Sequence, residues 1–353
     1  MVGSGQGLDS FLKEDPLHWY GQDHLAVYGP RLPLLLKVLA IDKPLSLQVH
    51  PTGEQAQRGW DGERAIRERL PKELWNYKDV NGKPEMAYAL TPTTVMCGLR
   101  PVKTIRAMLQ RLLTVGYGRH FAFLEEEMAP DHALHRLLKT IYSLEEHELR
   151  PLLSELVESV KEEASLPRSF DGIFLTEADI ILLLADEYPA DPGLFAPLLL
   201  NLLHLERGEA LYLEPRTLHA YVKGDLIELM SASDNVLRAG LTTKKVDVRE
   251  LLAVVETSEQ PIERAPVLVG SSGRLHILTP TEDFHLMVLK SGHYAISERR
   301  SIELLLVAEG TATFEYGGVQ HTLTAGRCYV VAASVANYTL DVDGLVFAAD
   351  VPR

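Results

Sequence analysis

The stretch LPLLLKVLAIDKPLSLQVHP, residues 32–51, decides the fold and contains the first part of a candidate site. Its apolar run predicts a buried strand that ends in Gln48 and His50. Residues two apart on a strand point to the same side of the sheet, so both side chains can reach one ion. Unpaired polar groups at the end of a buried strand are costly, which favours a functional reason for them.

Two other stretches supply the remaining ligands of a predicted metal site. Lys83-Pro84-Glu85 contributes Glu85, and residues 215–219 contribute His219. Two imidazoles, a carboxylate and an amide oxygen include no thiolate, which suits zinc or a similar divalent ion and leaves room for water or substrate oxygens. With one anionic ligand the ion keeps a net positive charge and can act as a Lewis acid, so we expect a catalytic site.

Composition limits the classes of partner. The chain has 353 residues, of which 46% are hydrophobic and 24% charged, enough for two or three packed units. Its net charge of -14 argues against nucleic acid and acidic membrane surfaces as partners. A small anion is still a suitable ligand, because its site needs only local positive charge.

Cysteine usage and the apolar runs predict a cytoplasmic protein. Cys97 and Cys328 are far apart and form no C-x-x-C motif, so we expect two small buried thiols in a reducing compartment. The start of the chain has no secretory pattern. The apolar runs are shorter than the ~20 residues that span a bilayer.

The hydrophobic period changes along the chain. Short strands and one helix, near residues 54–70, are predicted up to residue 100. Residues 101–188 have a helical period, with three to five helices expected and with start signals at Ser143 (followed by Glu146) and Thr176 (followed by Asp179). Strands return after residue 192, interrupted by one predicted helix near residues 247–255.

An internal repeat indicates two barrels. His219 follows Gly208 by eleven residues, and Asn337 follows Gly326 by the same offset. A glycine turn, a strand, a break and an inward polar residue are typical of cupin-like barrels. We therefore predict a mainly β protein with an α-helical insert, built from two cupin-like (jelly-roll) barrels of which only the first binds metal. The expected domains are a discontinuous catalytic barrel (1–100 and 189–281), a helical domain (101–188) and a carboxy-terminal barrel (282–353).

From about residue 33 to its end the chain resembles type I phosphomannose isomerases. The similarity is specific at SLQVHP, at NGKPEMAYAL and at LHAYVKGDLIELMSASDNVLRAGLTTKK. The resemblance implies one zinc ion per chain, bound by Gln48, His50, Glu85 and His219. It also implies interconversion of mannose 6-phosphate and fructose 6-phosphate, in which a proton moves between carbons 1 and 2 through an enediol.

The resemblance assigns a catalytic role to Arg238 and a substrate-facing role, towards the phosphate, to Lys244. Together with Lys245 these residues form a cationic cluster in an acidic chain, which suits phosphate although such a cluster can also be a solvated loop.

The general base stays open between Lys83, Glu228, Tyr221 and Asp234, each of which can instead act by hydrogen bonding behind the site. We expect Lys83 to assist catalysis, and the other three to bind substrate together with Ser46.

The chain also departs from the family pattern. Family members usually have a Trp-rich amino-terminal section where this chain has a short one. We therefore expect either a late start or a truncated first barrel, and the open sheet edge of a truncated barrel would invite dimerisation. The expected state is thus a monomer or a homodimer. Glu214 and Arg216 replace a smaller, glycine-containing loop. The alternatives are a cupin iron dioxygenase, which favours histidine-rich ligation, and a non-enzymatic sugar-binding cupin, which has no need of both metal ligands and cations.

Overall fold

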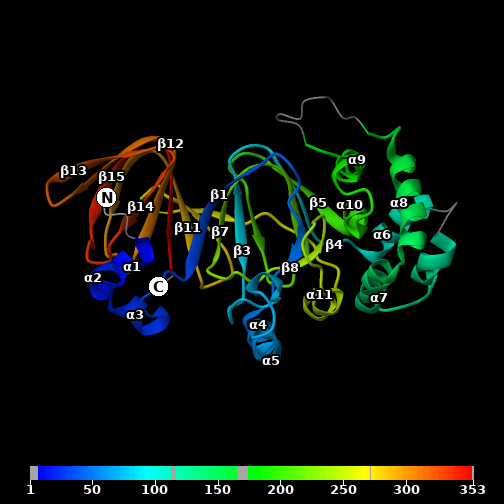
Figure 1. Cartoon of the computed structure of the whole chain (residues 1–353). Coiled ribbons are helices and arrows are strands. Elements are labelled where there is room, and N and C mark those ends of the chain that lie inside the picture. The colour runs from blue at the N-terminus through cyan, green and yellow to red at the C-terminus, as the bar shows by residue number, and fades with distance from the viewer. Residues whose placement is uncertain (1–6, 113–116, 165–173, 271, 352–353) are drawn as a thin grey trace. The chain divides into compact units, whose positions relative to one another are not determined.

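The computed structural model describes residues 7–112, 117–164, 174–270 and 272–351 (Figure 1). The chain forms two compact units. One consists of Val38–Glu228 and Ser233–Arg264, and the other of the residues up to Lys37, Leu229–Ala232 and those from Ala265 onwards. The division into three domains at residues 100, 188 and 281 stays a prediction.

The unit of residues 38–228 and 233–264 is built around an eight-stranded sheet system. Its main path runs β5-β4-β7-β2-β8, while β1 pairs with β7, and β3 pairs with β6 and β7. The strands are β1 (Leu34–Ile41), β2 (Leu47–Val49), β3 (Glu85–Ala89), β4 (Thr93–Leu99), β5 (Leu200–Leu205), β6 (Ala210–Leu213), β7 (His219–Ser231) and β8 (Leu237–Gly240).

Strand β7 changes partners at Gly224. Its first residues pair with β4 and, at His219, with β2, and its other partners are β1 and β3. Gly224 has a φ of +117°, and a Cβ there would lie 2.5 Å from Thr93 Oγ1 and 2.8 Å from the Pro92 carbonyl oxygen. Only glycine fits this close approach in the left-handed region. The missing side chain therefore lets β7 pass close to Pro92 and Thr93.

The helical insert packs beside β4 and β5 (Figure 1). Its buried side chains share one core with Leu47, Val49 and Met96, which lie on the outer face of the sheet. Because side chains alternate along a strand, this packing directs Gln48 and His50 to the inner face. The helices are α6 (Val102–Leu109), α7 (Pro130–Ser143), α8 (Glu146–Val160), α9 (Glu177–Glu187) and α10 (Ala196–Leu199), with short turns η2 (Gln110–Leu112), η3 (Tyr117–Phe121), η4 (Ala122–Glu125) and η5 (Pro192–Phe195).

One of the two predicted helix starts is confirmed. Thr176 caps α9, and its side chain and that of Asp179 form a reciprocal capping box. The prediction at Ser143 is wrong, because Ser143 is the last residue of α7 and Glu145 caps α8 in its place. The expected number of insert helices is confirmed, since α6 to α9 lie within the described part of residues 101–188.

The helix predicted near residues 54–70 is two shorter helices. They are α4 (Gly53–Gly62) and α5 (Arg64–Arg67), and they are followed by the turn η1 (Lys72–Leu74). Gly59 and Gly62 weaken the helical preference of this stretch. A Cβ at Gly59 would meet the Tyr77 ring at 2.1 Å, so the glycine is needed for packing. The helix predicted near residues 247–255 is α11 (Val248–Val254).

The second unit contains a seven-stranded antiparallel sheet in the order β13-β12-β15-β11-β10-β9, with β14 paired to β12. Gly326 and Gly208 both have positive φ before a short strand, and each short strand is followed by a strand of 13 residues, β15 or β7. The two curled sheets agree with the predicted pair of barrels. The elements are α1 (Leu8–Leu12), α2 (Pro16–Tyr20), α3 (Gln22–Tyr28), β9 (Val267–Val269), β10 (Leu275–Ile277), β11 (His285–Ile296), β12 (Glu303–Tyr316), β13 (Val319–Thr324), β14 (Arg327–Val331) and β15 (Tyr338–Asp350).

Both cysteines are free thiols. Cys97 is buried as predicted, and burial raises its thiol pKa to about 12. The prediction for Cys328 is wrong, because its residue surface is exposed on β14, a strand that pairs with β12 alone and so has an open side. Within the described ranges, no helix has the length and apolarity needed to cross a membrane.

Candidate metal centre and active site

The candidate site is built on the short strand β2, between β7 and β8. Gln48 lies directly opposite His219 on one side and Arg238 on the other. Directly opposed residues of antiparallel strands present their side chains on the same face. The sequence prediction of a shared inner face for Gln48 and His50 thus extends to His219 and Arg238, which come from distant parts of the chain.

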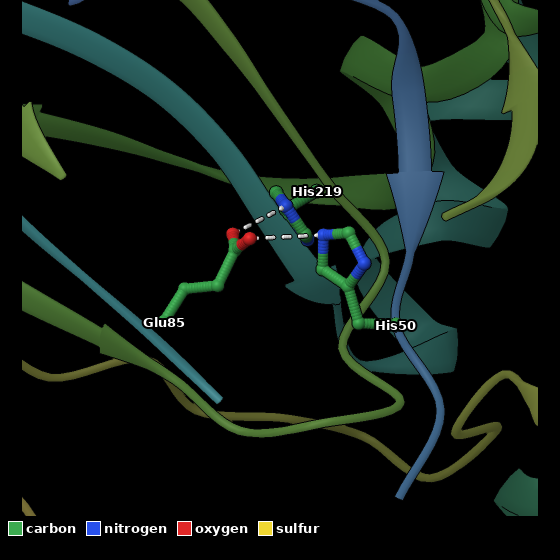
Figure 2. Close-up of side chains that lie close together, drawn as sticks. All are labelled: His50, Glu85 and His219. Carbon is green, nitrogen blue, oxygen red and sulfur yellow. Dashed lines mark ion pairs between the residues drawn. The ribbon is translucent and has the colours of Figure 1, made fainter. Parts of the chain in front are cut away.

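Three buried side chains meet on this face (Figure 2). His50 Nε2 lies 3.1 Å from Glu85 Oε1, and His219 Nε2 lies 3.3 Å from Glu85 Oε2. The candidate ligand atoms of the three residues all lie within 4.8 Å of one another. The side-chain amide nitrogen of Gln48 lies 3.4 Å from His219 Nε2. The structure therefore brings together all four residues predicted to bind metal.

The second ring nitrogen of each histidine identifies its tautomer. His50 Nδ1 lies 2.7 Å from the Asn235 carbonyl oxygen, and His219 Nδ1 lies 2.9 Å from the Thr217 carbonyl oxygen. A carbonyl oxygen can only accept, so each Nδ1 carries the proton and each Nε2 of the neutral ring presents a lone pair. Those lone pairs face the Glu85 carboxylate, which is itself an acceptor.

Acceptors that face one another leave polar atoms without partners. His50 Nε2 and both carboxylate oxygens of Glu85 are buried and form no hydrogen bond with the described residues, although the Lys83 ammonium lies close to Oε1. Such groups are expensive to bury unsatisfied. A divalent cation among them would satisfy the lone pairs of both rings and the carboxylate, and oxygen and nitrogen donors of this kind suit zinc.

Lys83 adds a positive charge next to the cluster. Its Nζ lies 3.0 Å from Glu85 Oε1, and both side chains are buried. Burial by itself raises the pKa of Glu85, but the adjacent side chains of His50, Lys83 and His219 together outweigh it and hold this pKa well below its usual range. Burial lowers the pKa of His50, which keeps the ring neutral and able to coordinate.

Arg238 is a half-buried cation on the same face. Among the described residues its guanidinium has no ion pair or hydrogen bond, and partial burial lowers its pKa. Lys78, which was not among the residues predicted from sequence, interacts electrostatically with it: burial and then Arg238 lower the Lys78 pKa. No motif marks Lys78, because only the fold places it beside Arg238.

The other predicted site residues lie at different depths. Tyr221 is fully buried two residues after His219, and burial followed by the charges of Glu228 and Glu85 raises its pKa well above the usual value. Its hydroxyl has no partner among the described residues. Glu228 is buried on β7, whereas Asp234 is exposed.

Ser46 is half-buried immediately before β2. The side chain of Lys244 is exposed and forms no ion pair within the described ranges. The charge of Lys245 is less available to a phosphate than the charge pattern predicts, because its Nζ lies 3.2 Å from Asp247 Oδ2.

The loop before His219 is held by Arg216. Its φ of +77° lies in the left-handed region that favours glycine, in agreement with the unusual loop composition. Its Nη1 lies 2.8 Å from Glu256 Oε2, and its backbone N–H donates to the His50 carbonyl at 2.7 Å. The ion pair ties this loop to the segment after α11, and the backbone hydrogen bond ties it to His50.

The barrel fold and the His–Glu–His cluster together define a cupin-type protein with a candidate metal centre. Residues 4–102 match the catalytic domain of type I phosphomannose isomerases, and residues 112–200 match the helical insertion domain of that family. The chain belongs to the type I phosphomannose isomerase family.

Individual relatives support this family membership. The chain is 34% identical over 319 residues to the mannose-6-phosphate isomerase of Escherichia coli strain K12, a match that covers 89% of this chain and 77% of that protein. It is 33% identical over 306 residues to the human mannose-6-phosphate isomerase, covering 80% and 68% of the two chains.

Solved structures are similar over almost the whole chain. The apo form of mannose 6-phosphate isomerase from Salmonella typhimurium matches with a TM-score of 0.87 and 28% identity, covering 99% of this chain and 87% of that one. A mannose 6-phosphate isomerase bound with zinc and yttrium matches with a TM-score of 0.86 and 29% identity, covering 99% and 86%.

Proposed function

We propose that this chain is a zinc-dependent aldose-ketose isomerase that interconverts mannose 6-phosphate and fructose 6-phosphate. The observation that carries this function is the set of buried acceptor atoms of His50, Glu85 and His219 on the inner face of the first barrel. Family membership supports the substrate, and one zinc-bound relative supports the metal.

Zinc would be held by the two Nε2 atoms, the Glu85 carboxylate and the Gln48 amide oxygen. The buried acceptor atoms suit a cation. The two neutral rings and the carboxylate could hydrogen-bond to one another only if one of them took up another proton. When bound, zinc would supply a Lewis acid that polarises the substrate carbonyl. Three of these side chains are buried, so their positions are set by the core before substrate enters.

Arg238 is proposed to stabilise negative charge on the substrate oxygens as the enediol forms. It lies opposite Gln48, it is half-buried, and no carboxylate of the described residues neutralises it. A planar guanidinium can donate two parallel hydrogen bonds to such oxygens. Since this charge develops during the reaction, the contact would act mainly on turnover.

Lys83 is proposed to assist the proton transfer between carbons 1 and 2. Its ammonium group already lies 3.0 Å from a Glu85 oxygen, at the edge of the ligand cluster. Tyr221 is proposed as a hydrogen-bond donor to substrate, because its raised pKa keeps the phenol protonated at neutral pH. Glu228 and Asp234 are proposed as acceptors for sugar hydroxyls.

The phosphate is proposed to bind at Lys244 and Ser46, away from the reacting carbons. The exposed side chain of Lys244 has no intramolecular ion pair within the described ranges, so its charge is available to an anion. Binding energy from a remote phosphate would fix the orientation of the sugar at the metal.

The substrate assignment is tested with purified protein and three sugars. Mannose 6-phosphate should be converted to fructose 6-phosphate in a coupled assay, whereas mannose and glucose 6-phosphate should react far more slowly. Equal turnover of mannose and mannose 6-phosphate would contradict the phosphate assignment. Absence of turnover by zinc-loaded, folded protein on any of the three would refute the isomerase function.

A further inference from the structure

We propose that Asn235 is a positioning residue that fixes the ligand geometry of the metal centre. The inference rests on the proposed metal function, and it concerns a residue that contributes no side-chain atom to the ligand cluster. Asn235 lies between β7 and β8, and its residue surface is 0% exposed. Full burial of an amide requires that its polar atoms be satisfied.

The side chain of Asn235 fastens the segment that leads to Glu85. Its Oδ1 accepts the backbone N–H groups of Lys78 at 2.7 Å and Asp79 at 3.2 Å. Its Nδ2 donates to the Asp79 carbonyl at 2.9 Å, to Asp79 Oδ1 at 3.2 Å and to the Asn81 carbonyl at 3.0 Å. One side chain therefore binds the backbone on both sides of the turn that precedes Lys83 and Glu85.

Asp79 and Ser233 complete the same network. Ser233 Oγ donates to Asp79 Oδ1 at 2.9 Å and accepts the Asn235 N–H at 3.2 Å. Asp79 Oδ2 accepts the Asp234 N–H at 2.8 Å. These bonds join residues 78–81 to residues 233–235, directly before the strand that carries Arg238.

The backbone of Asn235 acts on a ligand itself. Its carbonyl oxygen accepts the Nδ1–H of His50 at 2.7 Å and so keeps the Nε2 lone pair directed at Glu85. Partners of this kind behind a metal ligand fix the tautomer and the orientation of the ring, and their loss typically lowers metal affinity about 10- to 100-fold. Asn235 thus links His50, the Glu85 segment and the Arg238 strand.

An asparagine is the side chain that fits this position. Aspartate has nearly the same shape but lacks the two N–H donors, and it would place a second negative charge 3.2 Å from Asp79 Oδ1. The carbonyl groups of Asp79 and Asn81 would lose their donor, and the turn would move relative to His50.

The test compares Asn235→Asp with a matched control, Asn201→Asp. Asn201 is also an asparagine of the same unit whose Nδ2 donates to three backbone carbonyls, those of Cys97, Gly98 and Gln260. None of these three is a proposed ligand. Zinc affinity is measured by competition with a chromophoric chelator, and folding is followed by circular dichroism and thermal melting.

We expect Asn235→Asp to bind zinc about 10- to 100-fold more weakly than wild type, while Asn201→Asp keeps wild-type affinity even if its melting temperature falls as much. Equal zinc affinity of folded Asn235→Asp and wild type would overturn the proposal. So would an equal loss of affinity in both variants, because a general loss of stability would then explain it.

A milder variant covers the case in which Asn235→Asp does not fold. Ser233→Ala removes the hydroxyl that receives the Asn235 N–H, and it should weaken zinc binding several-fold in a folded protein; unchanged affinity would then overturn the proposal. The wild type separates the two ideas. If the wild type binds no zinc, the proposed function fails. If the wild type binds zinc and the variants bind it equally tightly, only the proposed role of Asn235 fails.

Discussion

Replacing Glu85 by glutamine removes the one anionic ligand while keeping the shape of the side chain. In the metal-bound protein we expect zinc affinity to fall by at least about 100-fold, because even residues behind the ligands change it 10- to 100-fold. Zinc at a concentration 1,000 times its dissociation constant stabilises a protein by ~4.1 kcal/mol, and a 100-fold weaker site leaves ~1.4 kcal/mol of this.

The zinc-dependent rise in melting temperature should therefore shrink by about 5–11 °C, since ~1 kcal/mol corresponds to about 2–4 °C in a protein unit of this size. The assay is a thermal melt with chelator and with buffered zinc.

The same substitution has a separate effect on the metal-free protein. Lys83 is buried next to Glu85 and would lose the carboxylate 3.0 Å away, and breaking a buried pair in this way costs up to about 3–5 kcal/mol. The metal-free melt measures this loss, and the zinc increment is measured relative to it.

Glu228→Gln is the control, because it neutralises another buried carboxylate that lies outside the His–Glu–His cluster. If Glu85→Gln keeps the full zinc increment of the wild type, Glu85 is not a ligand and the reasoning is refuted.

Three further predictions concern turnover, the second barrel and pH. Arg238→Lys should lower kcat about 100- to 1,000-fold with little change in KM, whereas Lys244→Ala should mainly raise KM. Steady-state kinetics measures both parameters, and a wild-type kcat for Arg238→Lys would show that Arg238 is not catalytic. Asn337 stands where the repeat would place a histidine, and its side chain accepts the backbone N–H of Glu298 at 3.1 Å, so Asn337→Ala should leave zinc content and turnover nearly unchanged. A large fall in turnover of folded protein would count against a structural role. The metal-free protein should lose stability as pH falls below about 6.5, because His50 then takes up a proton in the unfolded protein but not in the folded one. It should lose more below about 4.5, because Glu85 also takes up a proton in the unfolded protein only. Denaturant melts across this pH range that show no such loss would contradict the pKa directions.

The parts of the site that depend on local periodicity could be predicted from the sequence. Gln48 and His50 share a face because alternation along a strand is a property of the backbone, and the register with His219 agrees. The choice of Glu85 and His219 depended on residue types and on the family resemblance, and the fold brings them within reach of His50.

Features that depend on tertiary packing could not be predicted. The acceptors behind His50 and His219 are backbone carbonyls, which any residue type provides. The cation cluster predicted from LRAGLTTKK loses Lys245 to an ion pair with Asp247, although the two are close in sequence, because their pairing depends on the conformation of the loop.

The helix start expected at Ser143 failed for a similar reason. The preceding helix continues through Ser143, and glutamate side chains form the capping box of α8 two residues later. Capping preferences select among nearby candidates, and the packing of the apolar stripe decides which one is used.

The central claim is that catalysis depends on one metal ion held by residues from three distant segments. The most direct test removes all metal with a chelator, verifies the removal by elemental analysis, and titrates zinc back while turnover of mannose 6-phosphate is followed. We predict no isomerisation in metal-free protein and a linear recovery that ends at one zinc per chain, with no recovery in His219→Ala. Full turnover of protein shown to contain no metal would contradict the account.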